Sequence, residues 1–295
     1  MPLVYDTIEY QREKCLEITG FEGSVKSLTI PEQIGGLAVR SIGRHAFERR
    51  ADLLEVSLPA SLRRLSLFAF HNCANLRKMT LHDSVEDYYD GVIRQCSELE
   101  TIELYGESPY ALMKEMLGDN DHAMSFHMHL PAEEICLSFP SYALIASENT
   151  MARTIQFAYE GGGYAYRNCV HKKEIRYREY DRLFSFMEHD DPSFAAVIAT
   201  DRLMYPHDLD EVSQMRYTEF LRGHAAEALD LFIKRGMIDR VRMITEKGMA
   251  DENAIAAALR TASDRKETAI CALLMESGRK VNKQDTGLSL ELEDW

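Results

Sequence analysis

The chain has 295 residues, of which 45% are hydrophobic and 28% are charged, a composition that excludes a disordered or fibrous protein and predicts two globular domains. Lys and Arg number 34 against 48 Asp and Glu, so the formal charge of -14 disfavours nonspecific binding to nucleic acid or to an anionic membrane. We therefore expect neither nucleic acid nor a membrane as a partner.

The N-terminus lacks the basic segment and apolar run of a secretory signal, and no stretch of about 18 consecutive apolar residues occurs. The six cysteines are scattered without a C-x-x-C pair, which predicts free thiols rather than a zinc site or a disulfide framework. Together these observations predict a cytoplasmic protein.

The first third of the chain contains a 23-residue repeat, preceded by a predicted strand or hairpin over residues 4–21. Within each repeat, apolar and polar residues alternate as in a short strand with one buried face, so successive repeats predict a parallel sheet. An earlier copy at 28–47 carries five extra residues around Gly35 and Gly36, which predict a loop. The columns that share the spacing are Phe47, Phe70 and Ile93; Leu53, Leu76 and Leu99; Val56, Met79 and Ile102; Leu58, Leu81 and Leu104; and Cys73 with Cys96.

These residues resemble the BspA-like class of leucine-rich repeats over about residues 18–105. The resemblance is carried by Leu28-Thr29-Ile30-Pro31, Ser41-Ile42-Gly43 and His45-Ala46-Phe47, and then by Leu58-Pro59, Phe68-Ala69-Phe70, Cys73 and Leu76. In the third copy His82 replaces the proline. The resemblance implies a solenoid, a bacterial source, and a role in protein interaction or adhesion.

The outward face of the predicted sheet is the candidate binding surface, because repeat proteins often bind partners along such a stripe. It is small and polar, with no aromatic anchor, and the same residues are equally well explained as cross-strand pairs that stabilise the sheet. The candidate residues are Ser27, Thr29, Glu55, Ser57, Lys78, Thr80, Thr101 and Glu103.

After the repeats, residues 109–118 begin with proline and end with glycine, which predicts a helix that caps the solenoid. Strands are predicted at 126–130, 135–139, 154–159 and 164–170, with the three glycines at 161–163 as a hairpin loop. Helices follow near 183–203, 209–222, 224–235, 238–247, 251–263 and 266–277, and residues 236–248 have a weak similarity to half of an ankyrin-type unit.

Residues 126–180 hold the only concentration of candidate chemical groups. His127 and His129 would point the same way on a strand and are weak candidates for metal ligands, although a closed zinc site needs four ligands. Cys169 lies among basic residues that favour a thiolate, yet a buried inert cysteine explains it better. No motif of a common hydrolase, metalloprotease, phosphate loop or calcium loop occurs, and no cofactor or catalytic residue is predicted.

The fold class predicted is α+β: a short leucine-rich solenoid with a parallel sheet, a small β element, and a C-terminal domain resembling a helical repeat. The segments are 1–118, 119–178, 179–278 and a polar tail at 279–295. The function predicted is noncatalytic binding or scaffolding of a protein partner. The alternative is an enzyme or redox-responsive factor with its site in residues 126–180.

Overall fold

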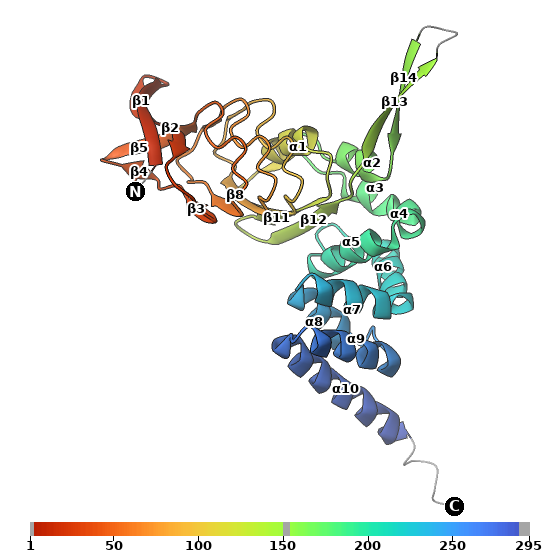
Figure 1. Ribbon diagram of the computed structural model, residues 1–295. Helices are drawn as coiled ribbons and strands as arrows, with labels where there is room; N and C mark the ends of the chain where they lie inside the picture. Colours follow the sequence, from red (N-terminus) through yellow and green to blue (C-terminus); the bar gives the residue numbers. More distant parts are fainter. Residues whose placement is uncertain (1–2, 150–153, 289–295) are drawn as a thin grey trace, which may run out of the picture. The chain divides into compact units, whose positions relative to one another are not determined.

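The computed structural model describes residues 3–149 and 154–288 and divides into two compact units, residues 1–183 and 184–295 (Figure 1). The finer division into four segments stays a prediction. Part of the predicted polar tail, residues 289–295, lies outside the described residues.

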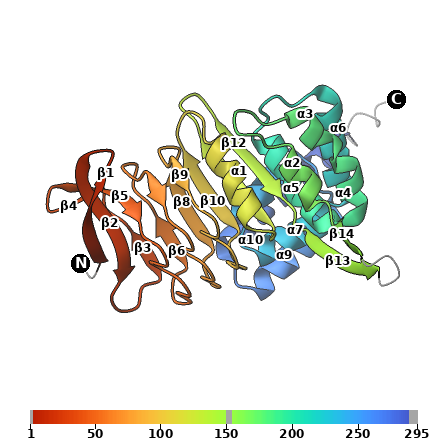
Figure 2. The same ribbon diagram turned by 90° about the horizontal axis from the view of Figure 1, so that it is seen from above.

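The first unit is a solenoid in which the chain coils between two sheets (Figure 2). Sheet A has the strand order β1-β2-β5-β7-β9, with β4 paired to β5, and sheet B has the order β12-β11-β10-β8-β6-β3. Sheet A consists of β1 (Leu3–Tyr10), β2 (Glu13–Phe21), β4 (Gln33–Ile34), β5 (Leu37–Ile42), β7 (Arg64–Leu65) and β9 (Asp87–Tyr88). Sheet B consists of β3 (Ser27–Thr29), β6 (Glu55–Ser57), β8 (Lys78–His82), β10 (Thr101–Tyr105), β11 (Met124–His129) and β12 (Glu134–Phe139).

The repeat columns form the core of the solenoid. Val56, Met79 and Ile102 are at most 2% exposed and occupy the same register position on three neighbouring parallel strands. The rings of Phe47 and Phe70 stack with centroids 5.0 Å apart. Parallel strands with one buried face confirm the solenoid that the repeat spacing predicts.

The five extra residues of the first copy form the predicted turn. β4 and β5 pair as an antiparallel hairpin, and Gly35 and Gly36 between them have φ values of 61° and 82°. Because residues that carry a side chain rarely adopt this left-handed backbone conformation, the turn favours glycine at both positions.

The predicted capping helix is α1 (Tyr110–Asp119), which follows β10 where earlier coils place a strand of sheet A. At its end, the Asp119 carboxylate accepts hydrogen bonds from the backbone of Gly91 and Ile93, both at 2.9 Å. The Asn120 side-chain amide donates to the carbonyls of Ile93 and Cys96. In the preceding coil, the Phe68 and Phe70 N–H groups donate to backbone carbonyls of the next repeat, and the Cys96 thiol of that repeat donates to the Phe70 carbonyl. Asp119 and Asn120 therefore replace the missing repeat.

Beyond α1 the strands predicted at 126–130, 135–139 and 154–159 are present as β11, β12 and β14 (Thr154–Glu160), and the structure departs from the prediction at two places. β13 (Ala143–Asn149) and β14 form an antiparallel pair, and β13 was not predicted. The predicted strand at 164–170 and the hairpin loop at 161–163 are wrong, because residues 163–168 form α2 (Gly163–Asn168). α3 (Tyr177–Arg182) completes the unit.

Close packing explains why residues 163–168 form a helix rather than a strand. A Cβ at Gly163 would lie 2.1 Å from the carbonyl oxygen of Pro140, so glycine is needed where α2 meets the hairpin base rather than in a turn. Along α2 and just beyond it, the buried residues Gly163, Tyr166, Arg167 and Val170 recur at helical spacing.

The second unit is helical, as predicted after residue 183. The helix predicted near 183–203 is divided into α4 (Phe184–Asp190) and α5 (Pro192–Met204), and α10 (Thr268–Leu288) continues past the predicted end at 277 into the predicted tail. Asp191 caps α5, Asp210 caps α6 (Glu211–Gly223) and Asp251 caps α9 (Glu252–Asp264), each by accepting a backbone N–H hydrogen bond. No helix in the described ranges has the length and apolar run needed to cross a membrane. The helices are α4 (Phe184–Asp190), α5 (Pro192–Met204), α6 (Glu211–Gly223), α7 (Ala225–Lys234), α8 (Ile238–Glu246), α9 (Glu252–Asp264) and α10 (Thr268–Leu288).

Candidate functional site

The predicted outward residues of sheet B lie in two straight rows across the strands. The first row is Ser27, Glu55, Lys78 and Thr101, and the second is Thr29, Ser57, Thr80 and Glu103. All eight side chains are exposed or half-buried, whereas the residues between them on each strand are buried. The register therefore places these candidate residues on one face, while their role in binding stays a prediction.

A third row of the same face was missed from the sequence. His82, Tyr105 and His129 are register partners at the ends of β8, β10 and β11. The Tyr105 ring is stacked on the His129 ring with centroids 4.3 Å apart, its centroid is 5.4 Å from that of His82, and its side chain is 38% exposed. The face thus has the aromatic anchor that the sequence reasoning did not find.

The charged groups of this face interact across neighbouring strands. Glu103 receives the Lys78 ammonium at 3.0 Å and His129 Nε2 at 2.6 Å. Burial raises the pKa of Glu103, but these two hydrogen bonds outweigh it, so the pKa is lowered from its ordinary value. His129 Nδ1 also lies 3.3 Å from Glu134. The carboxylates hold the His129 ring in the orientation that stacks on Tyr105.

Some of the outward residues also form the cross-strand pairs that the sequence suggested as an alternative. Glu55 and Lys78 are register partners, but Lys78 reaches Glu103 and Glu55 accepts a hydrogen bond from Ser27 at 3.5 Å. These contacts are partly exposed cross-strand pairs, which is the role that the alternative interpretation gives to these residues.

The structure separates the groups considered for chemistry in residues 126–180. His127 Nε2 lies 3.4 Å from the Cys136 thiol on β12, whereas His129 turns to Glu103 and Glu134. Among the described residues no group of three or more His, Cys, Asp or Glu side chains is arranged to hold a metal ion. The metal candidates His127 and His129 therefore gain no support.

Cys169 does not have the electrostatics of a nucleophile. Burial raises the pKa of this thiol to about 12, so it stays protonated at neutral pH. Cys73 and Cys96 are buried, and their thiols donate to the Phe47 and Phe70 carbonyls at 3.0 and 3.1 Å. These thiols pack the fold, which weighs against a redox-responsive site built on them.

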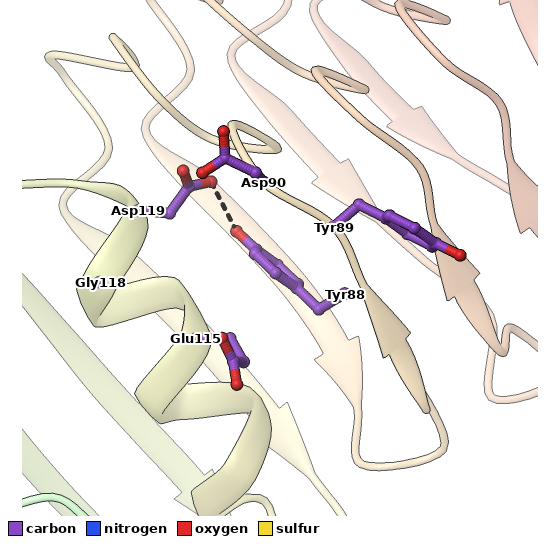
Figure 3. A pocket seen from close by; sticks show the side chains of 6 residues that line it. All are labelled: Tyr88, Tyr89, Asp90, Glu115, Gly118 and Asp119. Carbon is purple, nitrogen blue, oxygen red and sulfur yellow. Dashed lines mark hydrogen bonds between the residues drawn. The ribbon is translucent and has the colours of Figure 1, made fainter.

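A cavity of about 230 Å³ lies between β9 and α1 and was not predicted (Figure 3). Its lining includes Tyr88, Tyr89, Asp90, Glu115 and Asp119. Burial raises the pKa of Tyr88, as does the nearby Asp119 carboxylate, so the hydroxyl stays protonated and donates to Asp119 at 3.1 Å. The third repeat's departure from the pattern, Tyr-Tyr-Asp at 88–90, was the sequence signal for this site.

Residues 20–112 match the family model described as a BspA type leucine rich repeat region, in six copies. This part of the chain is therefore a BspA-type leucine-rich repeat region. No curated protein matches the chain.

Three solved structures are similar to about a third of the chain. A leucine-rich repeat protein from Bacteroides ovatus is 22% identical with a TM-score of 0.31, covering 35% of this chain and 30% of its own. The T. pallidum leucine-rich repeat protein is 22% identical with a TM-score of 0.25, covering 35% and 69%. A leucine-rich cell surface protein from Faecalibacterium prausnitzii is 24% identical with a TM-score of 0.27, covering 38% and 33%.

Leucine-rich repeat regions generally mediate protein–protein interaction, because stacked repeats present an extended, regular surface. The repeat region therefore implies a scaffold for protein interaction.

Proposed function

We propose that the protein is a noncatalytic binding or scaffolding protein that holds a protein partner on the outward face of sheet B. The observation that carries this proposal is the third row, where Tyr105 is stacked on His129 and remains 38% exposed. Tyrosine anchors surrounded by polar groups dominate the energetics of protein interfaces. The polar residues of the other two rows supply the hydrogen-bonding rim that such an anchor needs.

The arrangement of this face favours binding over catalysis. Its carboxylate Glu103 accepts hydrogen bonds from Lys78 and His129, and its pKa is lowered, so it is a poor general acid at neutral pH. Four of the strands that carry the face, β6, β8, β10 and β11, are paired on both sides, which keeps their side chains in fixed positions, and β3 is the edge of the sheet. A rigid surface loses little entropy when a partner binds.

An affinity capture from lysate of the source organism tests the proposal. The wild-type chain is compared with a variant in which Glu55, Lys78 and Thr80 are replaced by alanine. The matched control replaces Thr7, Glu9 and Lys14, three exposed residues of the same types on the β1–β2 hairpin.

We expect the wild-type chain and the control to capture the same protein and the sheet B variant to lose it. A sheet B variant that retains every captured protein would overturn the assignment of the face. The cytoplasmic location also stays a prediction, to be checked by fractionation of the source cells.

A further inference from the structure

Two adjoining cavities at the C-terminal end of the solenoid lie away from the two rows of the outward face. The first, of about 230 Å³, is the cavity between β9 and α1, and the second, of about 490 Å³, reaches Tyr142 and Tyr159 at the base of the β13–β14 hairpin. Gly118 and Asp119 line both cavities, so the two meet at the end of α1.

The carboxylates of these cavities outnumber their cations. Asp90, Glu115, Asp119 and Asp121 line the two cavities, and Arg94 is the single Lys or Arg among the lining residues that the structure describes. Arg94 lies 2.6 Å from Asp90 and 3.5 Å from Asp119. The walls are therefore negative, as is the chain as a whole.

The charge on α1 is placed where a helix tolerates it least. Glu115 and Asp119 are one turn apart on one face, where like charges repel each other. Asp119 also ends the helix, next to the negative end of its dipole, and the last turn holds no basic residue. A cation in the cavity would relieve both repulsions.

Asp119 is the buried group at the junction of the two cavities. Its side chain is 4% exposed, and burial raises its pKa despite hydrogen bonds from Ile93, Tyr88 and Gly91 and the nearby Arg94. The donors present thus compensate its charge only in part. A further positive charge in the cavity would stabilise the ionised carboxylate.

Aromatic rings complete the walls. Tyr159 lies in the second cavity and stacks on Tyr164 with centroids 3.6 Å apart. Tyr142 packs against the guanidinium of Arg167 at 4.8 Å, so this wall already binds one cation through a ring face. Carboxylates beside tyrosine rings are the combination that recognises lysine and arginine side chains.

We propose that these cavities bind an extended peptide segment of a protein partner through its lysine or arginine side chains, with one cationic head group at Glu115 and Asp119. This site is independent of the outward face of sheet B. Lys172 competes for it, because its ammonium lies 2.9 Å from Glu115 on a side chain that is 71% exposed. An exposed ion pair of this kind is weak and is readily displaced.

The test measures fluorescence anisotropy of a labelled peptide of alternating glycine and arginine added to the full chain at low salt, beside the same peptide with glutamate in place of arginine. We expect binding of the arginine peptide alone. Glu115→Gln should weaken it roughly tenfold, because it removes a charge-assisted hydrogen bond. Lys172→Met should strengthen it, because it frees Glu115.

Matched controls separate this site from general electrostatic attraction. Glu98→Gln and Lys173→Met change the net charge by the same amounts at exposed residues that do not line the cavities. We expect the affinity for the arginine peptide to differ severalfold between Glu98→Gln and Glu115→Gln, and likewise between Lys173→Met and Lys172→Met. Equal affinities within either pair would overturn the site, and so would binding of the glutamate peptide. Arginine amide that binds as tightly as the peptide would overturn the peptide assignment.

Discussion

Replacing Asp119 by asparagine tests whether this side chain caps the last coil of the solenoid. Its Oδ1 accepts the Gly91 N–H at 2.9 Å, and its Oδ2 accepts the Ile93 N–H at 2.9 Å and the Tyr88 hydroxyl at 3.1 Å. Asparagine has one acceptor oxygen, so its NH2 group must face one of the two backbone N–H donors. An orphaned buried donor costs about 1–3 kcal/mol, and removal of the buried charge offsets part of this cost.

Hydrogen exchange measured by mass spectrometry on peptides spanning residues 88–100 reports the loss of stability in this coil. A loss of about 1–3 kcal/mol corresponds to exchange roughly five to a hundred times faster in this coil, since 1.4 kcal/mol is a factor of ten. Asp121→Asn is the matched control, because the Asp121 side chain is 59% exposed. Wild-type exchange rates in Asp119→Asn would refute the capping argument.

Three further predictions concern the same unit. Gly91→Ala should destabilise the protein by roughly 1–3 kcal/mol in urea unfolding, because Gly91 has φ +75° and a Cβ would lie 2.3 Å from the Phe68 ring; Gly118→Ala, where a Cβ meets nothing within 4 Å, should not. The pKa of Glu103 is lowered from 4.5, so its contribution to stability is present above that pH and is lost as the pH falls through the folded value. Glu103→Gln should therefore flatten the acid side of a stability-versus-pH curve, and an unchanged curve would contradict the assignment. The pKa of Cys169 is raised to about 12, so iodoacetamide at pH 8 should label it only after unfolding; rapid labelling of the native chain would show a reactive thiol.

The register of sheet B was predictable because one spacing fixes it. Glu55 and Lys78 are one repeat apart, and parallel strands from successive repeats must place them side by side. The length of each strand was harder to predict. Pro31 and Pro59 follow the first two strands and lack the N–H that continues a ladder.

The third row follows from the loss of that proline. His82 stands one repeat after Pro59 and carries an N–H, so β8 extends to it and its side chain joins the outward face. Tyr105 stands one repeat after His82, so β10 likewise extends to Tyr105 and its side chain joins the outward face. The replacement of this proline in the third copy was therefore the sequence signal for a longer strand.

The region after α1 was less predictable because its residues interact with distant parts of the chain. The buried guanidinium of Arg167 donates to the carbonyls of Gly163, Asn120, His122 and Pro140, so contacts across the unit stabilise α2. Local pattern does not encode these contacts. The three glycines at 161–163 therefore predicted a hairpin, although Gly163 is needed for close packing.

The most direct test of binding on sheet B is photo-cross-linking of the full chain with benzoylphenylalanine in place of Tyr105. The control places the same residue at Tyr5, which is 44% exposed on β1. The account predicts that position 105, and not position 5, cross-links the protein captured by the wild-type chain. If that partner cross-links equally at both positions, or binds without cross-linking at position 105, the outward face of sheet B is not its binding surface.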